Sequence, residues 1–538
     1  MIAGGLISWA AAQHGDRPSL VFRDRVFSHA QIESRSNRMA QALVALGLAP
    51  EERFAVLLEN SVESIDSVFG AEKAALTYVA LNARHTLAEH LEILADAQAS
   101  AVLVGPAFAS MVPSLLAAAG AALPHLRHVI GTGFEADGVV GLESLVIGAS
   151  EQAPNLQITG RHLGRIAYTS GTTGRPKGVA YTVERQLARL NNHFLAMEYG
   201  LSVDDAMLHV GPLTHAAGVY LFPCFLRGAR NVVLDRFDPM ALLTAIEQHR
   251  ITHLMLVPTM MARLVDAVEA GARADLSSLR RIHYGTAPTP VALLRRALRA
   301  FGPILRQQYG MTEAVQPLAV LYPHEHMGEA AAAEPAVPPM VDARGHGAVG
   351  EPTADDRLAS CGRPTCNVHI TVRGTDGQEL PAGSVGEIAI AHQGVAQVAF
   401  WRRPELEAEV IRDGWFYAGD LGRFDANGYL YIVGRNKDMI ISGGFNVYAR
   451  EVEEALLSHP DVADAAVLGL PDAQWGEMVA AVVVLRPQGQ VDAAALQSHC
   501  GERIAGYKKP RRIVMASELP RNAAGKVVKA RLSDLFER

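Results

Sequence analysis

The stretch at residues 168–178, which reads YTSGTTGRPKG, has the residue types of an anion-binding loop. Its glycines let the backbone bend closely around a ligand, and its serine and threonines add hydroxyl donors. Lys177 adds a mobile positive charge. The spacing does not fit the GxxxxGK(S/T) pattern of NTP-hydrolysing P-loops, which excludes that class. Because the stretch follows an apolar run and precedes a helical pattern reaching about residue 199, we expect a loop that binds a polyphosphate.

Lysine is rare in this chain, which has 7 Lys against 42 Arg. Apart from Lys73, the lysines fall in four short segments, at Lys177, Lys437, 508–509 and 526–529. Lysine is a compact, flexible point charge, whereas arginine is a planar fork. These segments are therefore where we expect contacts with a phosphate or a small carboxylate.

Further polar and aromatic side chains recur at the ends of expected strands. Tyr309 offers a flat face for a purine, and the Thr312 hydroxyl can hydrogen-bond a phosphate. Glu313 is a hard oxygen ligand of the kind that Mg²⁺ takes together with phosphate oxygens. Asp420 can accept hydrogen bonds from both ribose hydroxyls. The segments concerned are 211–218 (GPLTHAAG), 285–288 (GTAP), 307–313 (QQYGMTE), 413–420 (DGWFYAGD) and 434–438 (GRNKD).

Taken in this order, the segments resemble the motifs of AMP-forming acyl-CoA synthetases. These belong to the adenylate-forming superfamily, with carrier-protein adenylation domains and beetle luciferases. The resemblance runs from about residue 165 to the C-terminus, and the first 160 residues share only a general rhythm with the family. It implies that a carboxylic acid and MgATP give an acyl-adenylate and pyrophosphate, after which CoA gives acyl-CoA and AMP. No protein nucleophile is needed, so positioning and electrostatics supply the catalysis.

The resemblance implies a role for each matching residue of the nucleotide site. Lys526 matches the catalytic lysine, Thr312 and Glu313 match the phosphate and Mg²⁺ contacts, and His215 matches a gate beside the acyl carboxylate. Ala418 stands where threonine is common, which should matter little because the ribose contact belongs to Asp420. The residues expected to bind ATP or AMP are Thr169, Ser170, Gly171, Thr172, Thr173, Gly174, Lys177, Gly285, Thr286, Ala287, Pro288, Gln307, Gln308, Tyr309, Gly310, Met311, Asp420, Ile432 and Arg435.

The walls of the acid pocket follow from the same resemblance. They are His215, Val219, Tyr220, Gln308, Met311, Val315 and Gln316. A glycine is frequent in the family at the position of Gln308. The larger side chain favours a short or polar pocket, so we expect a medium-chain or aromatic acid.

The C-terminal segment resembles the family's CoA-binding face as well. Gly443 and Gly444 match a loop that lines a pantetheine tunnel, and Trp475 matches an aromatic residue that stacks on the adenine of CoA. The resemblance also implies that this segment rotates about a hinge at Lys437 between the two half-reactions. The remaining expected CoA contacts, an aromatic residue beside three positive charges, are Tyr507, Lys508, Lys509 and Arg511.

The pattern around these motifs predicts an α/β fold with largely parallel sheets. From about 50 to 310, short β-branched runs alternate with helical stretches, and two of the helices, at 239–249 and 290–301, begin with proline. Thr86 to Glu89 is a capping box that opens another helix. Ligands in such sheets lie beyond the C-terminal ends of the strands.

Later segments predict a modular second half. Residues 322–358, rich in Ala, Gly and Pro, read as a flexible insertion in which His324, Glu325, His326 and His346 are solvated rather than metal ligands. Short strands at 365–433 predict a small β-subdomain. We expect a large ATP- and acid-binding domain over 1–434, a hinge at 435–437, and a small α+β domain over 438–538.

Composition narrows the classes of partner. The 538 residues allow about two to four domains. A formal charge of −7 gives no reason to expect nucleic acid or an anionic membrane as partner. No apolar run approaches the ~20 residues that span a bilayer, and the N-terminus reads as a short helix. Four cysteines without metal spacing suggest a reduced, cytoplasmic protein, for which a homodimer is one compatible assembly.

Three other functions fit parts of the pattern. One is an adenylating enzyme that delivers its acyl group to a carrier protein, although no carrier module fits in this length. A second is a luciferase-like oxidation, for which no residue argues. The third is a non-catalytic sensor of acyl-adenylates, against which Glu313 and Lys526 count.

Overall fold

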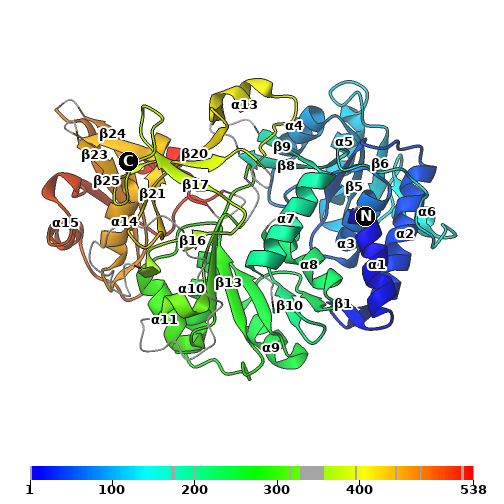
Figure 1. The fold of residues 1–538 in the computed structure, drawn as a ribbon, viewed down its shortest axis with the longest axis horizontal. Coiled ribbons are helices and arrows are strands. Elements are labelled where there is room, and N and C mark those ends of the chain that lie inside the picture. The colour runs from blue at the N-terminus through cyan, green and yellow to red at the C-terminus, as the bar shows by residue number, and fades with distance from the viewer. Residues whose placement is uncertain are drawn as a thin grey trace.

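The structure is a computed structural model that describes residues 3–170, 176–197, 200–214, 216–314, 317–327, 357–393, 397–442, 445–472, 474–522 and 526–536. Four β-sheets organise these residues. Figure 1 shows the N-terminal helices at one end, the orange and red C-terminal elements at the other, and the strands around β13 between them. The expected α/β class, with a separate small C-terminal domain of sheets and helices, is confirmed.

The N-terminal half is built on a seven-stranded sheet of order β7-β6-β5-β3-β4-β8-β9. All neighbours are parallel except β8 and β9, which are antiparallel. Helices α2, α3 and α6 pack on one face and α4 and α5 on the other, so the central strands are apolar on both sides. The strands are β3 (Arg53–Leu57), β4 (Thr77–Ala80), β5 (Ala99–Val104), β6 (His128–Gly131), β7 (Val140–Gly141), β8 (Leu163–Ser170) and β9 (Pro176–Thr182). The helices are α2 (His29–Ala45), α3 (Val62–Lys73), α4 (Leu87–Ala97), α5 (Val112–Ala118) and α6 (Leu142–Val146).

A nine-stranded sheet of order β16-β15-β14-β13-β12-β10-β11-β1-β2 forms the middle of the molecule. The strands from β14 to β1 run parallel, which brings their carboxyl ends to one edge. Its strands are β1 (Pro18–Phe22), β2 (Arg25–Ser28), β10 (Ala206–His209), β11 (Arg230–Val233), β12 (His253–Leu256), β13 (Arg281–Gly285), β14 (Leu305–Tyr309), β15 (Ala319–Leu321) and β16 (Arg363–Pro364).

The two faces of this sheet differ in polarity. One face is apolar and packs on α9 (Pro239–His249), α10 (Pro258–Glu269) and α11 (Val291–Phe301). The other face lies toward α1 (Ala3–His14), α7 (Val183–Ala196) and α8 (Leu221–Leu226). Residue alternation along β12, β13 and β14 places His253, His283 and Gln308 on this second face. A parallel strand is usually apolar on both sides, so these polar residues mark the face as one with a function beyond packing.

Two smaller sheets complete the fold. The first has the order β17-β18-β20-β19 with β21 beside β20, and it packs on the β8–β9 hairpin through one shared core. Its elements are β17 (Ile370–Arg373), β18 (Gly386–Ala391), α13 (Pro404–Val410), β19 (Ile411–Arg412), β20 (Trp415–Phe424) and β21 (Leu430–Arg435). The second has the order β23-β22-β25-β24 with β26 beside β25. Its elements are β22 (Met439–Ser442), β23 (Phe445–Tyr448), α14 (Ala449–Leu457), β24 (Val462–Asp472), β25 (Gly476–Leu485), α15 (Ala493–Gly501) and β26 (Arg512–Ala516).

Two local expectations are wrong. The loop at 168–178 does not lead into a helix, because β9 follows it and α7 begins only at Val183. Residues 171–175 therefore connect two antiparallel strands, and the next helix in the chain begins only after β9. His326 and Glu325 are buried rather than solvated. The Tyr284 hydroxyl lies 2.8 Å from His326 Nε2, and the Tyr429 hydroxyl donates to Glu325 at 2.8 Å.

Glu325 and His326 were expected to be solvated because their partners, Tyr429 and Tyr284, are far away in the sequence. His324 is exposed as expected, and His346 lies outside the described residues.

In the described part of the chain no helix is long and apolar enough to cross a membrane. All four cysteines are free thiols, and only Cys366 is exposed, in agreement with a structural role for the other three.

Candidate active site

The carboxyl edge of the nine-stranded sheet gathers the segments that the sequence singled out. β13 ends at Gly285 and β14 at Tyr309, where the two segments leave the sheet. A Cβ atom at Gly285 would lie 2.3 Å from the carbonyl oxygen of Gln308, so only glycine allows this approach. Thr286 has a φ of 69°, which β-branched residues rarely adopt. Such strain is typical of functional sites, where surrounding packing enforces it.

Asp420 is held between two side chains at this edge. Its Oδ2 accepts a hydrogen bond from the Tyr309 hydroxyl at 2.8 Å, and its Oδ1 lies 3.3 Å from Arg435 Nε. Asp420 and Arg435 are directly opposite each other on β20 and β21. Burial raises the pKa of Asp420, and Arg435 and Tyr309 oppose that shift. The result is a carboxylate of fixed orientation.

Gln307 and Gln308 point to opposite faces of β14. Gln307 accepts a long hydrogen bond of 3.5 Å from the Tyr284 hydroxyl. Gln308 is buried, and its Nε2 lies 3.5 Å from Met255 Sδ on the polar face. The sequence predicted both glutamines at the nucleotide and Gln308 also in the wall of the acid pocket. The two side chains lie on opposite faces of β14, and Gln308 lies on the same face as Met255 and His283.

Side chains from the β8–β9 hairpin and from α7 hold the backbone of Thr312 and Glu313 by hydrogen bonds. The Tyr181 hydroxyl donates to the carbonyl of Thr312, and Arg185 Nη2 donates to the carbonyl of Glu313. The Arg185 guanidinium also lies 4.3 Å from the centroid of the Tyr181 ring. Sequence reasoning missed both residues. The only sequence signal for them is that an arginine follows a tyrosine by four positions, shortly after the glycine-rich loop.

Lys526 reaches this edge from the C-terminal domain. Its backbone N–H donates to Asn522 Oδ1 at 2.9 Å, and its carbonyl accepts from Asn522 N at 2.8 Å, which closes a tight turn. The residue is exposed, yet surrounding protein and then Arg435 lower the pKa of its ammonium, whereas Asp420 and Glu313 raise it. The turn therefore brings Lys526 close to residues more than 90 positions earlier.

Two contacts of α14 hold the C-terminal domain in this orientation. Arg450 Nη2 donates to the carbonyl of Thr289 at 3.3 Å. The Glu454 carboxylate accepts a hydrogen bond from the backbone N–H of Val291, the first residue of α11. Thr289 and Val291 directly follow the 285–288 segment. The domain thus docks on the same strand–helix connection that carries the site.

The polar face of the nine-stranded sheet carries further buried side chains on the side of Gln308. Tyr220 is buried, and its ring lies 4.7 Å from that of His283 and 5.6 Å from that of His193. His283 is fully buried, and neither of its ring nitrogens has a hydrogen-bond partner among the described residues. Burial holds the pKa of His283 well below its usual value, so the ring is neutral. Sequence reasoning missed His283, although strand alternation places it on the side of Gln308.

Other expected acid-pocket residues are distributed differently. Val219 packs on the cluster that contains Tyr220 and Met255. Met311 packs instead on the core around Tyr309, beside the five-stranded sheet. His215, Val315 and Gln316 lie outside the described residues.

The anion loop is described only at its two ends. Thr169 and Lys177 are paired across β8 and β9, and Ser170 is paired with Pro176. The sequence also expected Gly171, Thr172, Thr173 and Gly174 to contact the ligand, and these lie outside the described residues. Lys177 therefore stands where the hairpin opens into the loop.

The face expected to bind CoA carries exposed aromatic rings. Phe445 and Tyr507 pack with ring centroids 4.9 Å apart, and the Arg511 guanidinium lies 4.2 Å from the Trp475 ring. Lys508 Nζ lies 2.6 and 2.7 Å from the carboxylate oxygens of Glu451, so its charge is already offset. Gly443 and Gly444 lie outside the described residues. Sequence reasoning missed Phe445.

The fold is that of an adenylate-forming enzyme. Candidate nucleotide contacts gather at the sheet edge, and Lys526 reaches them from the second domain. The chain matches the family model described as AMP-binding enzyme over residues 7–398, and the one described as AMP-binding enzyme C-terminal domain over residues 451–526. The protein belongs to the AMP-binding enzyme family, and it is an AMP-forming acid–thiol ligase.

Curated relatives and solved structures cover nearly the whole chain. The chain is 32% identical to the medium/long-chain-fatty-acid–CoA ligase FadD8 of Mycobacterium tuberculosis, with 97% of this chain and 88% of the relative covered. It is 34% identical to a feruloyl-CoA synthase of Amycolatopsis sp, with 95% and 94% covered. The structure of the amide bond synthetase McbA from Marinactinospora thermotolerans has a TM-score of 0.84 at 28% identity, with 99% and 100% covered.

Proposed function

We propose that this enzyme activates a compact carboxylic acid, of medium chain length or aromatic, and transfers it to CoA. A carboxylate oxygen attacks the α-phosphorus of ATP, the bond between the α- and β-phosphates breaks, and pyrophosphate leaves. The sulfur of CoA then attacks the acyl carbon, the bond to AMP breaks, and the thiol proton is released. The observation that carries the proposal is the convergence of Asp420, Glu313 and Lys526 from two domains.

Each nucleotide contact has a chemical role in this proposal. Asp420, fixed by Tyr309 and Arg435, accepts hydrogen bonds from the ribose hydroxyls. The Thr312 hydroxyl binds the α-phosphate, and Lys177 and the loop before it bind the outer phosphates. These contacts come from three sheets, with Asp420 on β20, Thr312 just after β14 and Lys177 on β9, and their separation fixes the direction in which the nucleotide lies.

Lys526 stabilises the charge that develops in the first step. Two anions, the carboxylate and the α-phosphate, have to approach each other. An ammonium that contacts both offsets their repulsion and stabilises the transition state more than the ground state. The surrounding protein partly desolvates this ammonium, which lowers its pKa and also strengthens its interaction with nearby anions.

Glu313 fits a magnesium ion that ATP brings with it. Mg²⁺ binds one or two carboxylates together with phosphate oxygens and waters. Within the described residues no group of three His, Cys, Asp or Glu side chains forms a metal site by itself. A single carboxylate beside the phosphate site is the donor set that suits a nucleotide-bound Mg²⁺, whose charge offsets that of the phosphates.

The preference for a compact acid rests on the buried polar groups under Gln308. Gln308 Oε1 and both nitrogens of His283 lack hydrogen-bond partners among the described residues. An alkyl tail long enough to cover these groups would leave them unsatisfied, at a cost of about 1–3 kcal/mol each. An acid with a ring or a polar substituent suits them better. The similar relatives that are named for aromatic acids, feruloyl-CoA synthase and indoleacetate–CoA ligase, support this choice.

Pyrophosphate release from the purified enzyme tests the proposal. We expect multiple turnovers with hexanoic, octanoic, benzoic or hydroxycinnamic acids when MgATP and CoA are both present. Palmitic acid as the best substrate would contradict the acid class. A single turnover that CoA does not accelerate would contradict CoA as the acceptor.

An amine acceptor is the second candidate, because the structure resembles that of an amide bond synthetase over 99% of the chain. In that reaction an amine nitrogen attacks the acyl-adenylate in place of the CoA sulfur. The exposed rings of Phe445 and Tyr507 and the half-buried ring of Trp475 favour CoA, whose adenine can stack there. Product analysis by mass spectrometry, with CoA and amines offered together, separates thioester from amide.

Gln308 should limit the length of the acid. We expect Gln308→Gly to raise the ratio of kcat/KM for dodecanoic over octanoic acid by about tenfold, because it removes a buried side chain from the floor of the pocket. Initial rates with both acids measure the ratio. Gln308→Met, which keeps the volume, is the matched control and should leave the ratio near that of the wild type. An unchanged ratio in Gln308→Gly would place the end of the pocket elsewhere.

A further inference from the structure

The amino end of α11 has no cap of its own. Its N-cap residue is Pro290, whose side chain accepts no hydrogen bond, and its first turn carries no acidic residue. The first N–H groups of a helix have no partner within the helix, and a carboxylate near them is stabilised by the helix dipole. The connection before this helix also carries Thr286, the residue with a φ of 69°. This end of α11 is therefore open to a partner from another element.

α14 of the C-terminal domain supplies that partner. The Glu454 carboxylate accepts a hydrogen bond from the N–H of Val291, the first residue of α11. Arg450, one turn earlier on α14, forms an ion pair with Glu454 and donates from Nη2 to the carbonyl of Thr289 at 3.3 Å. Both side chains are half-buried. α14 thus contacts a backbone donor and a backbone acceptor on the two sides of Pro290, and Figure 1 shows it beside α11.

The position of α14 fixes the position of Lys526. α14 packs on one face of β24 and β25. Leu519 and Val527, which flank the turn of Lys526, pack on the other face of the same two strands. Lys529 Nζ also lies 3.7 Å from Glu453 of α14. Because α14 and the turn share one sheet, docking of α14 on the large domain decides where the lysine lies.

We propose that Glu454 and Arg450 are positioning residues for the first half-reaction, because they cap α11 from the C-terminal domain and thereby hold Lys526 at the site. This role rests on the proposed function, which supplies the reaction that Lys526 serves. Thioester formation involves no attack on phosphorus. Loss of the cap should therefore slow adenylate formation far more than thioester formation.

Val291→Pro tests the cap from the side of the large domain. It removes the N–H that Glu454 accepts and keeps an apolar side chain. Proline is favoured at the first position of a helix, and Pro290, with φ −60° and ψ 137°, already has the extended conformation of a residue before proline. We expect pyrophosphate release in single turnovers to slow about tenfold, the scale of one lost hydrogen bond to a charged group. Thioester formation from pre-formed acyl-adenylate should change less than twofold.

Val291→Ala is the matched control, because it shortens the side chain and keeps the N–H. Both steps should stay within twofold of the wild type. Equal effects of proline and alanine, or equal slowing of both steps by proline, would overturn the proposal.

Glu454→Gln removes the charge from the other side of the same contact. It should slow the first step to a similar extent, and addition of Val291→Pro should slow it by less than a further twofold. Effects that multiply would mean that the two residues act independently, against the proposal.

An exchange of charges separates docking from the stability of α14. Arg450→Glu combined with Glu454→Arg keeps an ion pair at the same spacing on the helix, but it places a guanidinium at the Val291 N–H. The first step should be at least as slow as in Glu454→Gln. Recovery of the wild-type rate would show that the pair only stabilises α14 and would refute the cap.

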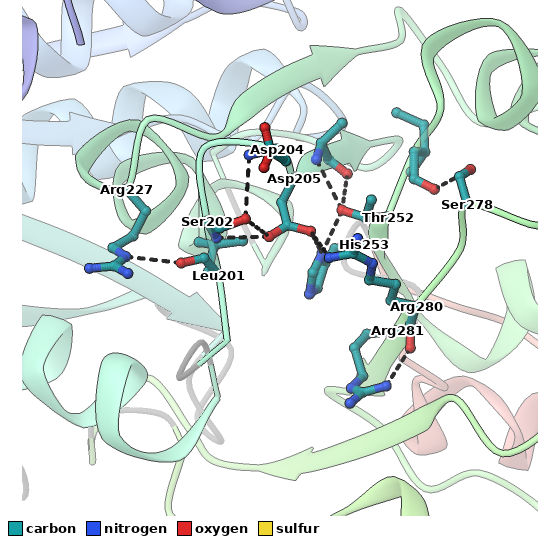
Figure 2. Close-up of polar contacts among 12 residues, drawn as sticks. Leu201, Ser202, Asp204, Asp205, Arg227, Thr252, His253, Ser278, Arg280 and Arg281 are labelled. Carbon is teal, nitrogen blue, oxygen red and sulfur yellow. Dashed lines mark hydrogen bonds and ion pairs between the residues drawn. The ribbon is translucent and has the colours of Figure 1, made fainter. Parts of the chain in front are cut away.

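Arg280→Gln controls for the loss of an arginine ion pair in the same βα unit. Arg280 Nη1 donates to Asp205 Oδ1 at 3.2 Å, just before β13 begins. Figure 2 shows this pair with Ser202, whose N–H and hydroxyl donate to Asp205 at 2.7 and 2.9 Å and remain when Arg280 is replaced. Both steps should stay within twofold of the wild type, whereas Arg450→Gln should slow the first about tenfold. Equal slowing by the two variants would contradict a role in docking.

The titration of Lys526 reports docking without any substrate. Surrounding protein and then Arg435 lower the pKa of the Lys526 ammonium from its ordinary value of 10.5. Labelling of the full chain with trace acetic anhydride across pH, followed by peptide mass spectrometry, measures that pKa. It should lie below 10.5 in the wild type and rise toward 10.5 in Val291→Pro, because an undocked lysine is solvated and away from Arg435.

Glu454→Gln should give the same rise, which keeps the test decisive if Val291→Pro does not fold. An ordinary pKa in the wild type, or an unchanged pKa in the folded variants, would overturn the proposal. Since labelling needs neither acid nor CoA, its result stands apart from the proposed function. Absence of turnover with every acid would contradict that function, and the labelling would still decide the docking.

Discussion

Lys526→Ala should slow formation of the acyl-adenylate by about 10³-fold, which corresponds to about 4 kcal/mol of transition-state stabilisation. The reason is that the ammonium lies near Asp420, Glu313 and Arg435, where we propose that the carboxylate and the α-phosphate meet. We expect the affinity for ATP to change far less, because the contacts of Asp420 and of the anion loop remain. Pyrophosphate release in single-turnover experiments measures the effect.

Lys529→Ala is the matched control for this variant. Lys529 lies three residues further on, with its Nζ 3.7 Å from Glu453 and 4.0 Å from Asp438. Its ion pairs are partly exposed and long, each worth about 0–1 kcal/mol, so its loss should change the rate less than threefold. Equal effects of the two substitutions would mean that positive charge near the C-terminus, and not the position of Lys526, matters.

The second half-reaction adds a separate check on Lys526. Thioester formation from pre-formed acyl-adenylate involves no attack on phosphorus. Lys526→Ala should therefore slow this step less than about tenfold, in contrast to the first step. A loss of both steps to the same extent would indicate that the substitution disturbs the fold of the turn at Asn522.

Asp420→Asn should raise KM for ATP by about 30-fold, or about 2 kcal/mol, with a smaller change in kcat. The asparagine keeps the shape of the side chain and still accepts a hydrogen bond from Tyr309. It loses the negative charge that pairs with Arg435 and that, in the proposed binding mode, accepts hydrogen bonds from both ribose hydroxyls. Initial rates at varied ATP concentration measure KM.

A comparison of ATP with 2′-deoxy-ATP shows whether Asp420 contacts the ribose. The wild type should prefer ATP by at least tenfold, and Asp420→Asn should lose most of that preference. Tyr309→Phe, which removes only the hydroxyl that orients Asp420, should reduce the preference in part. If Asp420→Asn keeps the full preference for ATP, the ribose lies elsewhere.

Short segments of sequence were enough to identify the chemistry of the nucleotide site. The anion loop, the 307–313 segment and the Lys526 turn carry their functional groups within a few residues, so the backbone itself sets the spacing. The same holds for local structure. The capping box at Thr86 forms as expected, and α9 runs from Pro239 to His249 as its proline and apolar periodicity predicted.

The expectations that were wrong or incomplete depend on partners distant in sequence. β9 forms because residues 176–182 pair with β8, although the segment also precedes a helical pattern. His326 and Glu325 are buried because they contact the hydroxyl groups of Tyr284 and Tyr429, respectively. The composition of residues 322–358, rich in Ala, Gly and Pro, gives no sign of such partners.

By itself the sequence determined the family and predicted the two half-reactions and the residues of the nucleotide site, because motif spacing can be read without knowledge of the fold. Tertiary structure alone decided which side chains meet. It brings Tyr309 to Asp420 across 111 residues, separates Gln308 from Gln307, and places His283 behind the acid pocket. It also brings the Glu454 carboxylate to the first residue of α11. The physical reason is that parallel strands align residues from separate βα units at common sheet edges, and no local pattern encodes that alignment.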